Sequence, residues 1–484
     1  MGEPDDQTLN GPDRTQSTKT PETLLEEAYG ARQEGDLATA AKALDGVLTA
    51  APNHPLPLTL RARVALERCE LDALARFDAA LRVDPGNADL HLGKAQALEM
   101  AGDIKGARVV AEQIADQAPG FTAALSYLSG LYLAGDETDF TRPFQRAAQR
   151  APTDPNIRAA WIDALAGIER FAMAADIAAI ARSAFPNQPH FALLEAMHAS
   201  ASGAWQRAET IYADLGVESL QRWLMEARHR VRAGDIPAAQ ILLDKALQSW
   251  SFDIAAWALQ GVVWRLAETP EARDRAGWLH EQAGLVQMLT LEAPDDLLPR
   301  ARSRLVQLHK DAGTPLSQSV RGGSQTRGVL FHRSDPVLAE LHTAILTTLA
   351  TYKEGSPLAD DSHPILRSRD EDWRLAGSWS VRLKAGGDYH AAHIHPSGLL
   401  SSALYVDIPE TVRDGDQPGW LELGRPPADL GLDLDPLAIL QPKEGHLALF
   451  PSTLYHGTRP FPATRDTKTR MTVAFDVITK SQQV

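Results

Sequence analysis

The chain has 484 residues, which is too long for one hydrophobic core and predicts roughly two to four domains. It carries 63 acidic against 48 basic residues, a formal net charge of −15, so it offers no overall positive potential for nucleic acid or anionic membranes. The single cysteine excludes an internal disulfide, and no apolar run reaches the roughly 18 residues that a bilayer span requires. We therefore expect a globular cytoplasmic protein without nucleic-acid or membrane partners.

The first twenty residues differ in composition from the rest. They are rich in Asp, Thr, Gly and Pro and lack the apolar core of a signal peptide. We expect residues 1–20 to form a disordered, solvated tail, with ordered structure beginning near Pro21.

Residues 21–291 contain a repeat. Two sequence markers recur along this segment with the same period. The first is a proline at intervals of 33 or 34 residues, at Pro52, Pro85, Pro119, Pro152 and Pro186. The second is a glycine followed by an alanine, at Gly35 and Ala40, Gly102 and Ala107, Gly203 and Ala208, and Gly234 and Ala239. A glycine can end a helix in the left-handed conformation, an alanine lets two helices approach closely, and a proline closes the second helix.

This organisation resembles the tetratricopeptide repeat, most closely where Ala79-Ala80-Leu81-Arg82-Val83-Asp84 ends at Pro85. About seven units fit into residues 21–291, which predicts an α-solenoid. The resemblance implies a groove that holds an extended peptide or a partner protein, and a purely structural or dimerising role is the alternative.

The pattern changes after Leu291. A helical linker extends to about Ala312, and an amphipathic helix is predicted from Pro336 to Tyr352. Short apolar runs punctuated by Pro and Gly predict strands at 378–383, 400–408, 420–423, 437–441, 445–450 and 470–478. Many short strands indicate a sandwich or jelly roll, so residues 292–484 are expected to form a β domain with an N-terminal helical linker.

Three histidines of this β domain could share one metal ion. His393 and His395 face the same way if the chain there is extended, whereas Ile394 faces away. His456 follows an apolar strand about sixty residues later and can supply a third imidazole. Such a site leaves positions on the metal open for a chelating co-substrate and O₂.

The order of residues from about Pro315 to Asp476 resembles the 2-oxoglutarate/iron(II) oxygenases. The elements that carry the resemblance are Trp379, His393-Ile394-His395-Pro396, Ser402, Tyr405, Phe450-Pro451-Ser452, His456 and Arg470. The stretch from Gly387 to Ser397 is also similar to the strand that holds the first iron ligand of aspartyl/asparaginyl β-hydroxylases, which likewise follow a helical repeat region. Prolyl hydroxylase type enzymes are similar as well.

This resemblance implies a double-stranded β-helix that uses Fe(II), 2-oxoglutarate and O₂. It assigns His393 and His456 to the iron and Arg470 to the distal carboxylate of 2-oxoglutarate, with Ser402 and Tyr405 beside the co-substrate. A guanidinium fork matches a carboxylate in two contacts, and Arg470 opens an apolar strand where a buried charge needs a partner. Arg465, in a polar turn, is the alternative.

The third metal ligand is open at this stage. The usual iron triad has Asp or Glu two residues after its first histidine, and His395 stands there in this chain. His395 can be the third ligand, the site can hold iron with two histidines as in the β-hydroxylases, or Asp407 can supply a carboxylate. Three neutral ligands would leave the site more positive than the common triad, which also suits zinc or copper.

The sequence therefore predicts a dioxygenase that hydroxylates a side chain of a protein or peptide presented by the repeat groove. A small-molecule oxygenase that uses the repeats for assembly is one alternative. A non-catalytic repeat scaffold with a degenerate metal pocket is the other.

Overall fold

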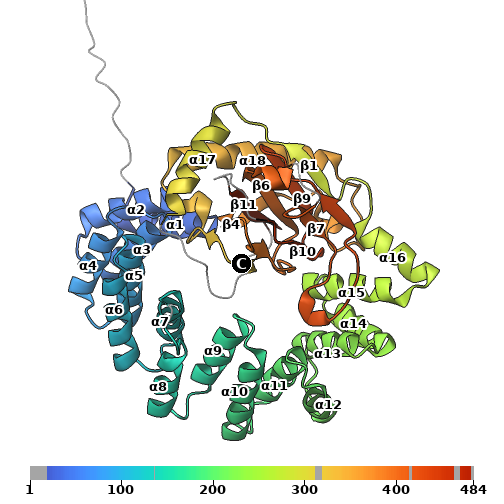
Figure 1. Ribbon diagram of the computed structural model, residues 1–484. Helices are drawn as coiled ribbons and strands as arrows, with labels where there is room; N and C mark the ends of the chain where they lie inside the picture. Colours follow the sequence, from blue (N-terminus) through green and yellow to red (C-terminus); the bar gives the residue numbers. More distant parts are fainter. Residues whose placement is uncertain (1–18, 136, 311–318, 414–416, 463–468, 481–484) are drawn as a thin grey trace, which may run out of the picture. The chain divides into compact units, whose positions relative to one another are not determined.

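The computed structural model describes residues 19–135, 137–310, 319–413, 417–462 and 469–480 (Figure 1). The expected tail, residues 1–20, lies outside these ranges except for its last two residues. The chain divides into two compact units, Met1–Lys94 and Ala95–Val484. Within the described residues, no helix has both the length and the apolar character needed to cross a membrane.

The first part of the chain is helical, as predicted. Its helices are α1 (Pro21–Gln33), α2 (Leu37–Ala50), α3 (Pro55–Glu67), α4 (Ala73–Val83), α5 (Ala88–Met100), α6 (Ile104–Gln117), α7 (Thr122–Ala134), α8 (Arg142–Arg150), α9 (Pro155–Ala166), α10 (Phe171–Ala184), α11 (His190–Ala201), α12 (Trp205–Asp214), α13 (Leu220–Arg232), α14 (Ile236–Ser249), α15 (Ile254–Ala267) and α16 (Pro270–His280). They fit eight two-helix units in the described chain, one more than the sequence indicated. In the last unit, α15 and α16, Glu268 makes the turn at φ 53° in place of a marker glycine.

Positive backbone φ angles confirm the predicted turn at the four marker glycines, whereas the described residues between α7 and α8 have no positive φ. The four marker glycines have φ between 76° and 86°. Cys69 and Glu169, at φ 51° and 60°, take the same place in units that have no glycine, so the chain bears some strain there. The alanines that follow the four glycines are all 0% exposed, as expected where two helices approach closely.

Side chains and prolines set the ends of these helices. Asp36, Asp103 and Asp235 each accept a hydrogen bond from a backbone amide in the first turn of α2, α6 and α14, respectively. This explains why aspartate follows three of the four marker glycines. The five periodic prolines directly follow the C-caps of α2, α4, α6, α8 and α10, which confirms their predicted role.

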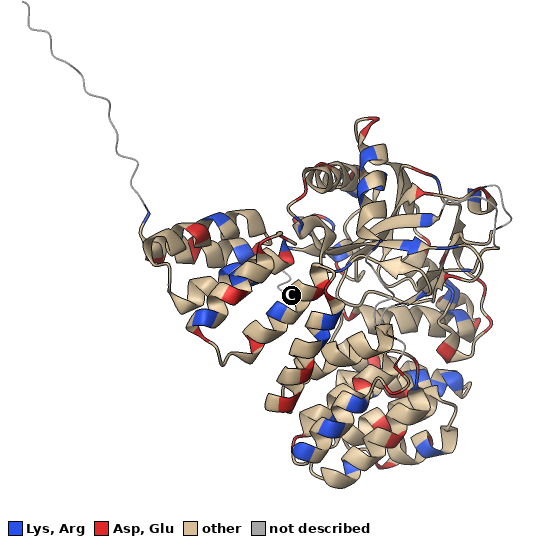
Figure 2. Ribbon diagram, turned by 60° about the vertical axis from the view of Figure 1, so that its left-hand side comes forward, with Lys and Arg blue, Asp and Glu red and all other residues tan. Residues whose placement is uncertain are grey.

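Acidic and basic residues are interspersed along the helices (Figure 2). Many of them pair between successive helices. Arg207 on α12, for example, donates to Asp176 on α10 at 2.9 Å and to Glu195 on α11 at 2.8 Å. The ion pairs thus add polar links to the apolar contacts between neighbouring helices.

The second part of the chain is built of antiparallel strands with a helical cover. It contains β1 (Gln287–Thr290), α17 (Leu297–Leu308), β2 (Val320–Arg321), β3 (Ser324–Gln325), α18 (Pro336–Gly355), β4 (Trp373–Leu383), β5 (Tyr389–His390), β6 (Leu400–Asp407), α19 (Glu410–Arg413), β7 (Leu421–Leu423), β8 (Ala438–Leu440), β9 (His446–Pro451), β10 (His456–Thr458) and β11 (Arg470–Thr479). Short 3-10 helices span Leu330–His332, Leu366–Ser368 and Ala428–Leu430. The six predicted strands and the predicted helix at 336–352 are all present.

The strands form a large and a small sheet. The large sheet has the order β1-β9-β6-β11-β4-β3, the small sheet has the order β10-β7-β8, and β2 pairs with β5 (Figure 1). Strand β1, which comes from the last residues of the segment expected to be helical repeat, pairs with β9 at the edge of the large sheet.

The large sheet is buried on both faces, because β6 turns alternate side chains to two different cores. Leu404 and Val406 pack with residues of α17 and α18 on one face. Ala403 and Tyr405 pack on the other face with Leu421 of the small sheet. Two facing sheets with a core between them confirm the predicted jelly roll, and the space between them also holds the histidines.

Buried histidines make the stability of the protein sensitive to acid. His280 at the end of α16 is 7% exposed, and burial lowers its pKa to about 3. His363 is 0% exposed and burial lowers its pKa, while its Nδ1 accepts hydrogen bonds from the amides of Ile365 and Leu366. A histidine with a lowered folded-state pKa stabilises the fold fully above the unfolded pKa of about 6.5, and that contribution is lost as the pH falls below it.

We therefore expect the urea midpoint of the full chain, followed by tryptophan fluorescence, to be lower at pH 5.5 than at pH 7.5. A histidine whose folded-state pKa is about 3, such as His280, costs about 1.4 kcal/mol of stability between pH 7.5 and pH 5.5. The His280→Asn protein should lose less of its midpoint between these two pH values than the wild type does. An equal or higher wild-type midpoint at pH 5.5 would contradict the prediction.

Candidate metal centre

Two segments bring the three predicted histidines together. His393 and His395 lie between β5 and β6, and His456 is the first residue of β10. The backbone of His393 pairs with that of His456, because each amide donates to the carbonyl of the other, at 3.1 and 2.9 Å. This bridge fixes two candidate ligands beside each other although they are far apart in sequence.

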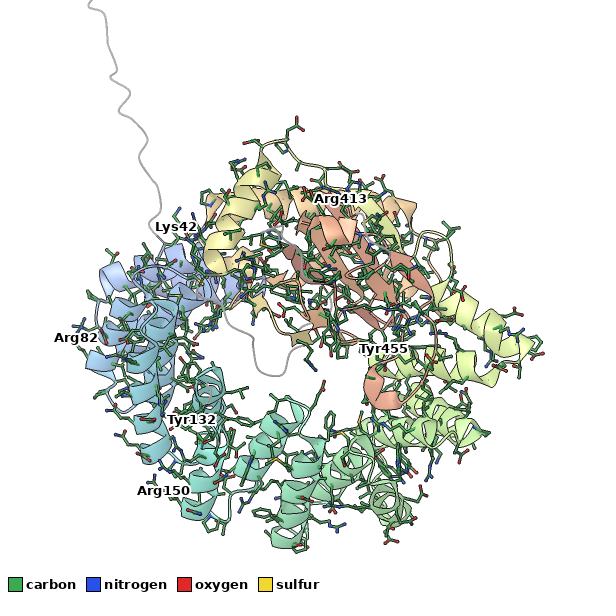
Figure 3. All side chains as sticks on the ribbon, viewed as in Figure 1. Lys42, Arg82, Tyr132, Arg150, Arg413 and Tyr455 are labelled. Carbon is green, nitrogen blue, oxygen red and sulfur yellow. The ribbon has the colours of Figure 1, made fainter. Side chains whose placement is uncertain are left out.

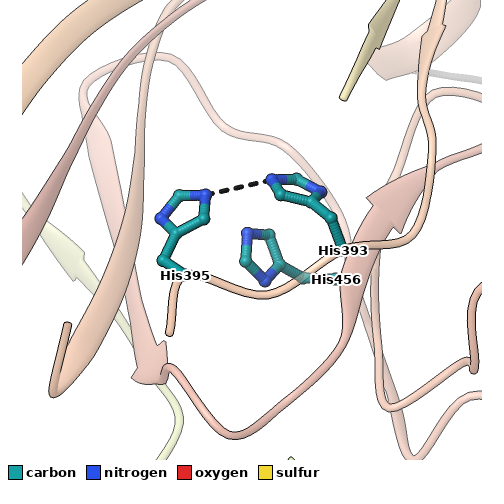
Figure 4. A group of neighbouring side chains, drawn as sticks. All are labelled: His393, His395 and His456. Atoms are coloured by element: carbon teal, nitrogen blue, oxygen red, sulfur yellow. Dashed lines mark hydrogen bonds between the residues drawn. The ribbon is translucent and has the colours of Figure 1, made fainter. Parts of the chain in front are cut away.

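The imidazoles converge on one point (Figure 4). One ring nitrogen from each of the three residues lies within 4.8 Å of the others. Nε2 of His393 and Nε2 of His395 are 3.0 Å apart. Two ligand nitrogens at right angles, each about 2.1 Å from a metal ion, are separated by about 3.0 Å, so this pair already has the spacing of neighbouring ligands.

The other nitrogen of each ring is held by an acceptor. Nδ1 of His393 donates to the carbonyl of Ala391 at 2.9 Å, and Nδ1 of His456 donates to the carbonyl of Leu454 at 3.1 Å. Nδ1 of His395 contacts the carboxylate of Asp476. With Nδ1 as the donor, Nε2 keeps the lone pair that a metal ion needs. The tautomers therefore suit a shared ion at the three Nε2 atoms.

Burial keeps the rings of His393 and His456 neutral. It lowers the pKa of His393 to about 3, with a smaller contribution from neighbouring His395, and it holds the pKa of His456 well below its ordinary value. Neutral imidazole is the form that binds metal ions, so protons compete little at neutral pH.

Asp476 is a site residue that the sequence did not indicate. The register of β11 against β4 shifts between Phe475 and Asp476, a bulge that turns the Asp476 carboxylate toward His395. The hydroxyl of Ser402 donates to the carbonyl of Phe475 at 2.7 Å and accepts from its amide at 2.9 Å, which stabilises the bulge. Ser402, predicted beside the co-substrate, thus uses its hydroxyl on the backbone next to Asp476.

We expect the Asp476→Asn substitution to weaken metal binding by about 10- to 100-fold, the usual cost of losing the carboxylate behind a histidine ligand. The neutral side-chain amide of asparagine replaces the negative carboxylate that orients and polarises His395. Titration with Co(II), followed by its visible absorption, measures the change. The matched variant Asp372→Asn, at an exposed position before β4, should bind Co(II) like the wild type.

Arg470 lies on the wall of the same pocket as the three histidines. It is 2% exposed, its Nε donates to the carbonyl of Gly419 at 2.8 Å, and its guanidinium carbon is 5.3 Å from the centre of the Tyr405 ring. Burial lowers the pKa of Arg470. No carboxylate among the described residues forms an ion pair with it, so a carboxylate ligand in the pocket would supply the missing counter-charge.

The remaining predicted residues have distinct positions. The Trp379 ring is 5.4 Å from that of His395, and Tyr405 is fully buried against the Arg470 guanidinium. Asp407 does not belong to the group of three histidines. Its carboxylate instead accepts hydrogen bonds from Arg302 at 3.3 Å and from the amide of Thr469 at 3.4 Å. The alternative Arg465 lies outside the described residues.

Ser319 and His390 complete the polar side of the pocket. The hydroxyl of Ser319 is 3.1 Å from Nε2 of His393 and 3.2 Å from Nδ1 of His390. The His390 ring stacks on that of His393 at 5.9 Å. Ser319 precedes β2 and has no motif around it, so nothing in the sequence could have pointed to it.

Comparison with known proteins supports both parts of the prediction. Residues 377–476 match the family model described as "Putative 2OG-Fe(II) oxygenase", and residues 71–132 match the model of the tetratricopeptide repeat. No curated protein matches the chain.

Several solved structures are similar in part. A tetratricopeptide repeat protein from Parabacteroides merdae is 17% identical with a TM-score of 0.31, over 47% of this chain and 92% of that chain. The MamA protein is 17% identical with a TM-score of 0.27, over 34% and 92%. PilF from Pseudomonas aeruginosa is 16% identical with a TM-score of 0.27, over 50% and 96%. By its family matches, the chain joins tetratricopeptide repeats to a domain of the 2OG-Fe(II) oxygenase type.

Proposed function

We propose that the protein is an Fe(II)- and 2-oxoglutarate-dependent dioxygenase that hydroxylates a side chain of a protein or peptide presented by the repeats. The convergence of three Nε2 atoms, each on a ring whose Nδ1 is held by an acceptor, supports this proposal most directly. The family match of residues 377–476 supports the same chemistry.

The side chains of the pocket have separate roles in the proposed reaction. His393, His395 and His456 would hold the iron through Nε2, and Arg470 would bind the distal carboxylate of 2-oxoglutarate. Iron(II), 2-oxoglutarate and O₂ together supply the oxidation of a C–H bond to an alcohol, with succinate and carbon dioxide as co-products.

Apolar side chains form the other walls of the pocket. Val381, Ala403, Leu421 and Phe450 line it beside the histidines and exclude water from the reacting centre. The Tyr405 ring lies against the Arg470 guanidinium, and Ser402, which lines the pocket, bonds to the backbone of Phe475 next to Asp476. We propose that they support the co-substrate site by fixing the positions of these two charged residues.

Anaerobic addition of Fe(II) and 2-oxoglutarate to the full chain tests the proposal. We expect a visible metal-to-ligand charge-transfer band, followed by succinate formation when O₂ is admitted. If the protein gives neither the band nor succinate, the dioxygenase proposal is wrong. A non-catalytic scaffold with a degenerate metal pocket would then be the better description.

The substrate class needs a second measurement. Tetratricopeptide repeats commonly bind peptides, so we expect succinate formation to be stimulated by a peptide library, with one peptide gaining the mass of an oxygen atom. Stimulation by small metabolites alone would favour a small-molecule oxygenase. A cytoplasmic location stays a prediction, which cell fractionation can test.

A further inference from the structure

The residues next to the metal-site histidines pack against the helical repeats. Ile394, between His393 and His395, and Tyr455, directly before His456, belong to one apolar cluster. That cluster also contains Ala258 and Val262 of helix α15, which are 1% and 3% exposed. Because successive residues of an extended chain face opposite ways, the imidazoles point into the pocket while their neighbours point at α15.

Polar contacts from helix α13 reach the same place. Arg228 donates to the hydroxyl of Tyr455 at 3.2 Å and to the carboxylate of Asp429 at 2.7 Å. Arg232, one turn further along α13, donates to the carbonyl of Asp429 at 2.7 Å and also pairs with its carboxylate. Figure 3 shows Tyr455 close to these helices.

The loop between β7 and β8 closes this set of contacts. Arg265 of α15 donates to the carbonyls of Gly424 and Asp435, near the two ends of the loop. The amide of Gly424 donates to the carbonyl of Tyr455 at 2.7 Å. Helices α13 and α15 therefore hold both the side chain and the backbone of the residue that precedes His456.

We propose that α13 and α15 position the metal-binding histidines, with Arg228 and Val262 as positioning residues. The repeats are then a structural part of the metal centre as well as a candidate binding surface. The inference rests on the proposed function, because it takes the three imidazoles as the ligands. Arg228 acts through Tyr455 on His456, and Val262 acts through the cluster that holds Ile394 and Tyr455.

Arg228→Met tests the inference in the full chain, with Arg230→Met as the matched control. Arg230 lies on the same helix but pairs with Glu209 at 2.6 Å and Glu226 at 3.2 Å, within the repeats. We expect Arg228→Met to weaken Co(II) binding about tenfold or more and to change the visible spectrum of the saturated Co(II) protein. Arg230→Met should leave both unchanged, and Arg228→Lys should restore part of the affinity.

Amide hydrogen exchange in the metal-free protein gives a second readout. The amides of His393 and His456 bond to each other's carbonyls, so their exchange reports the bridge between the two ligand segments. We expect Arg228→Met and Val262→Ala to speed this exchange, and Arg230→Met to leave it unchanged.

The two readouts separate the possible failures. If the wild type binds no Co(II) but the exchange results hold, the proposed function fails and the positioning by α13 and α15 stands. If Co(II) affinity, spectrum and exchange are all unchanged in Arg228→Met and Val262→Ala, the contacts only attach one part of the chain to another and the inference is wrong.

Discussion

The His456→Ala protein is expected to lose the charge-transfer band and to form succinate at the background rate. His456 is 7% exposed and contributes one of three convergent imidazoles, so its removal leaves two ligands and a cavity. Metal affinity should fall by more than about a hundredfold, because even losing a group behind a ligand costs about 10- to 100-fold. Co(II) titration and succinate assays measure both effects.

Two control variants make this result specific. His446→Ala removes a histidine at the start of β9, outside the group of three, and should bind Co(II) like the wild type. Asp407→Asn should also keep the metal, because that carboxylate pairs with Arg302. If Asp407→Asn lost the metal while His395→Ala kept it, the carboxylate reading of the third ligand would replace the three-histidine reading.

Local signals in the sequence predicted the architecture well. The spacing of the prolines and glycines follows from the two-helix unit itself, so it was visible without any tertiary information. The strands β4, β6, β9 and β11 were visible because each is an apolar run bounded by turn residues. Placing His393 and His395 on one side of an extended segment required only the alternation of side chains, and the packing of Ile394 in the opposite direction agrees with it.

Contacts between distant segments could not be predicted in this way. Asp476 reaches His395 because β11 has a bulge, and nothing in the sequence of a strand marks one extra residue. Ser319 reaches His393 from a segment without regular structure. Cys69 and Glu169 replace the turn glycine in two units at a backbone conformation that few side chains adopt, so the glycine marker misses both.

The docking of α13 and α15 on the β domain was hidden for a related reason. The period of the repeats and the alternation within the strands can each be explained without any contact between the two parts of the chain. Arg228 and Asp429 carry no sign in the sequence that they belong together, although their ion pair is 2.7 Å long in the structure. Partnerships of this kind depend on how two surfaces meet.

The Arg470→Lys protein is expected to bind metal normally and to bind 2-oxoglutarate poorly. Arg470 lines the pocket of the three histidines, and only a planar fork can bind a carboxylate through two parallel hydrogen bonds. Losing one charge-assisted hydrogen bond of about 1.5–3 kcal/mol raises the KM for 2-oxoglutarate roughly 10- to 150-fold. Lysine keeps the positive charge near Tyr405, so the effect should come from the geometry of the donor.

The same measurement on Arg465→Lys decides between the two candidate arginines. If Arg470 binds the co-substrate, Arg465→Lys keeps the wild-type KM, and Arg470→Lys keeps the wild-type affinity for Co(II) alone. The reverse pattern would move the carboxylate site to Arg465. It would leave Arg470, whose Nε is bonded to Gly419, as a buried structural cation of the jelly roll.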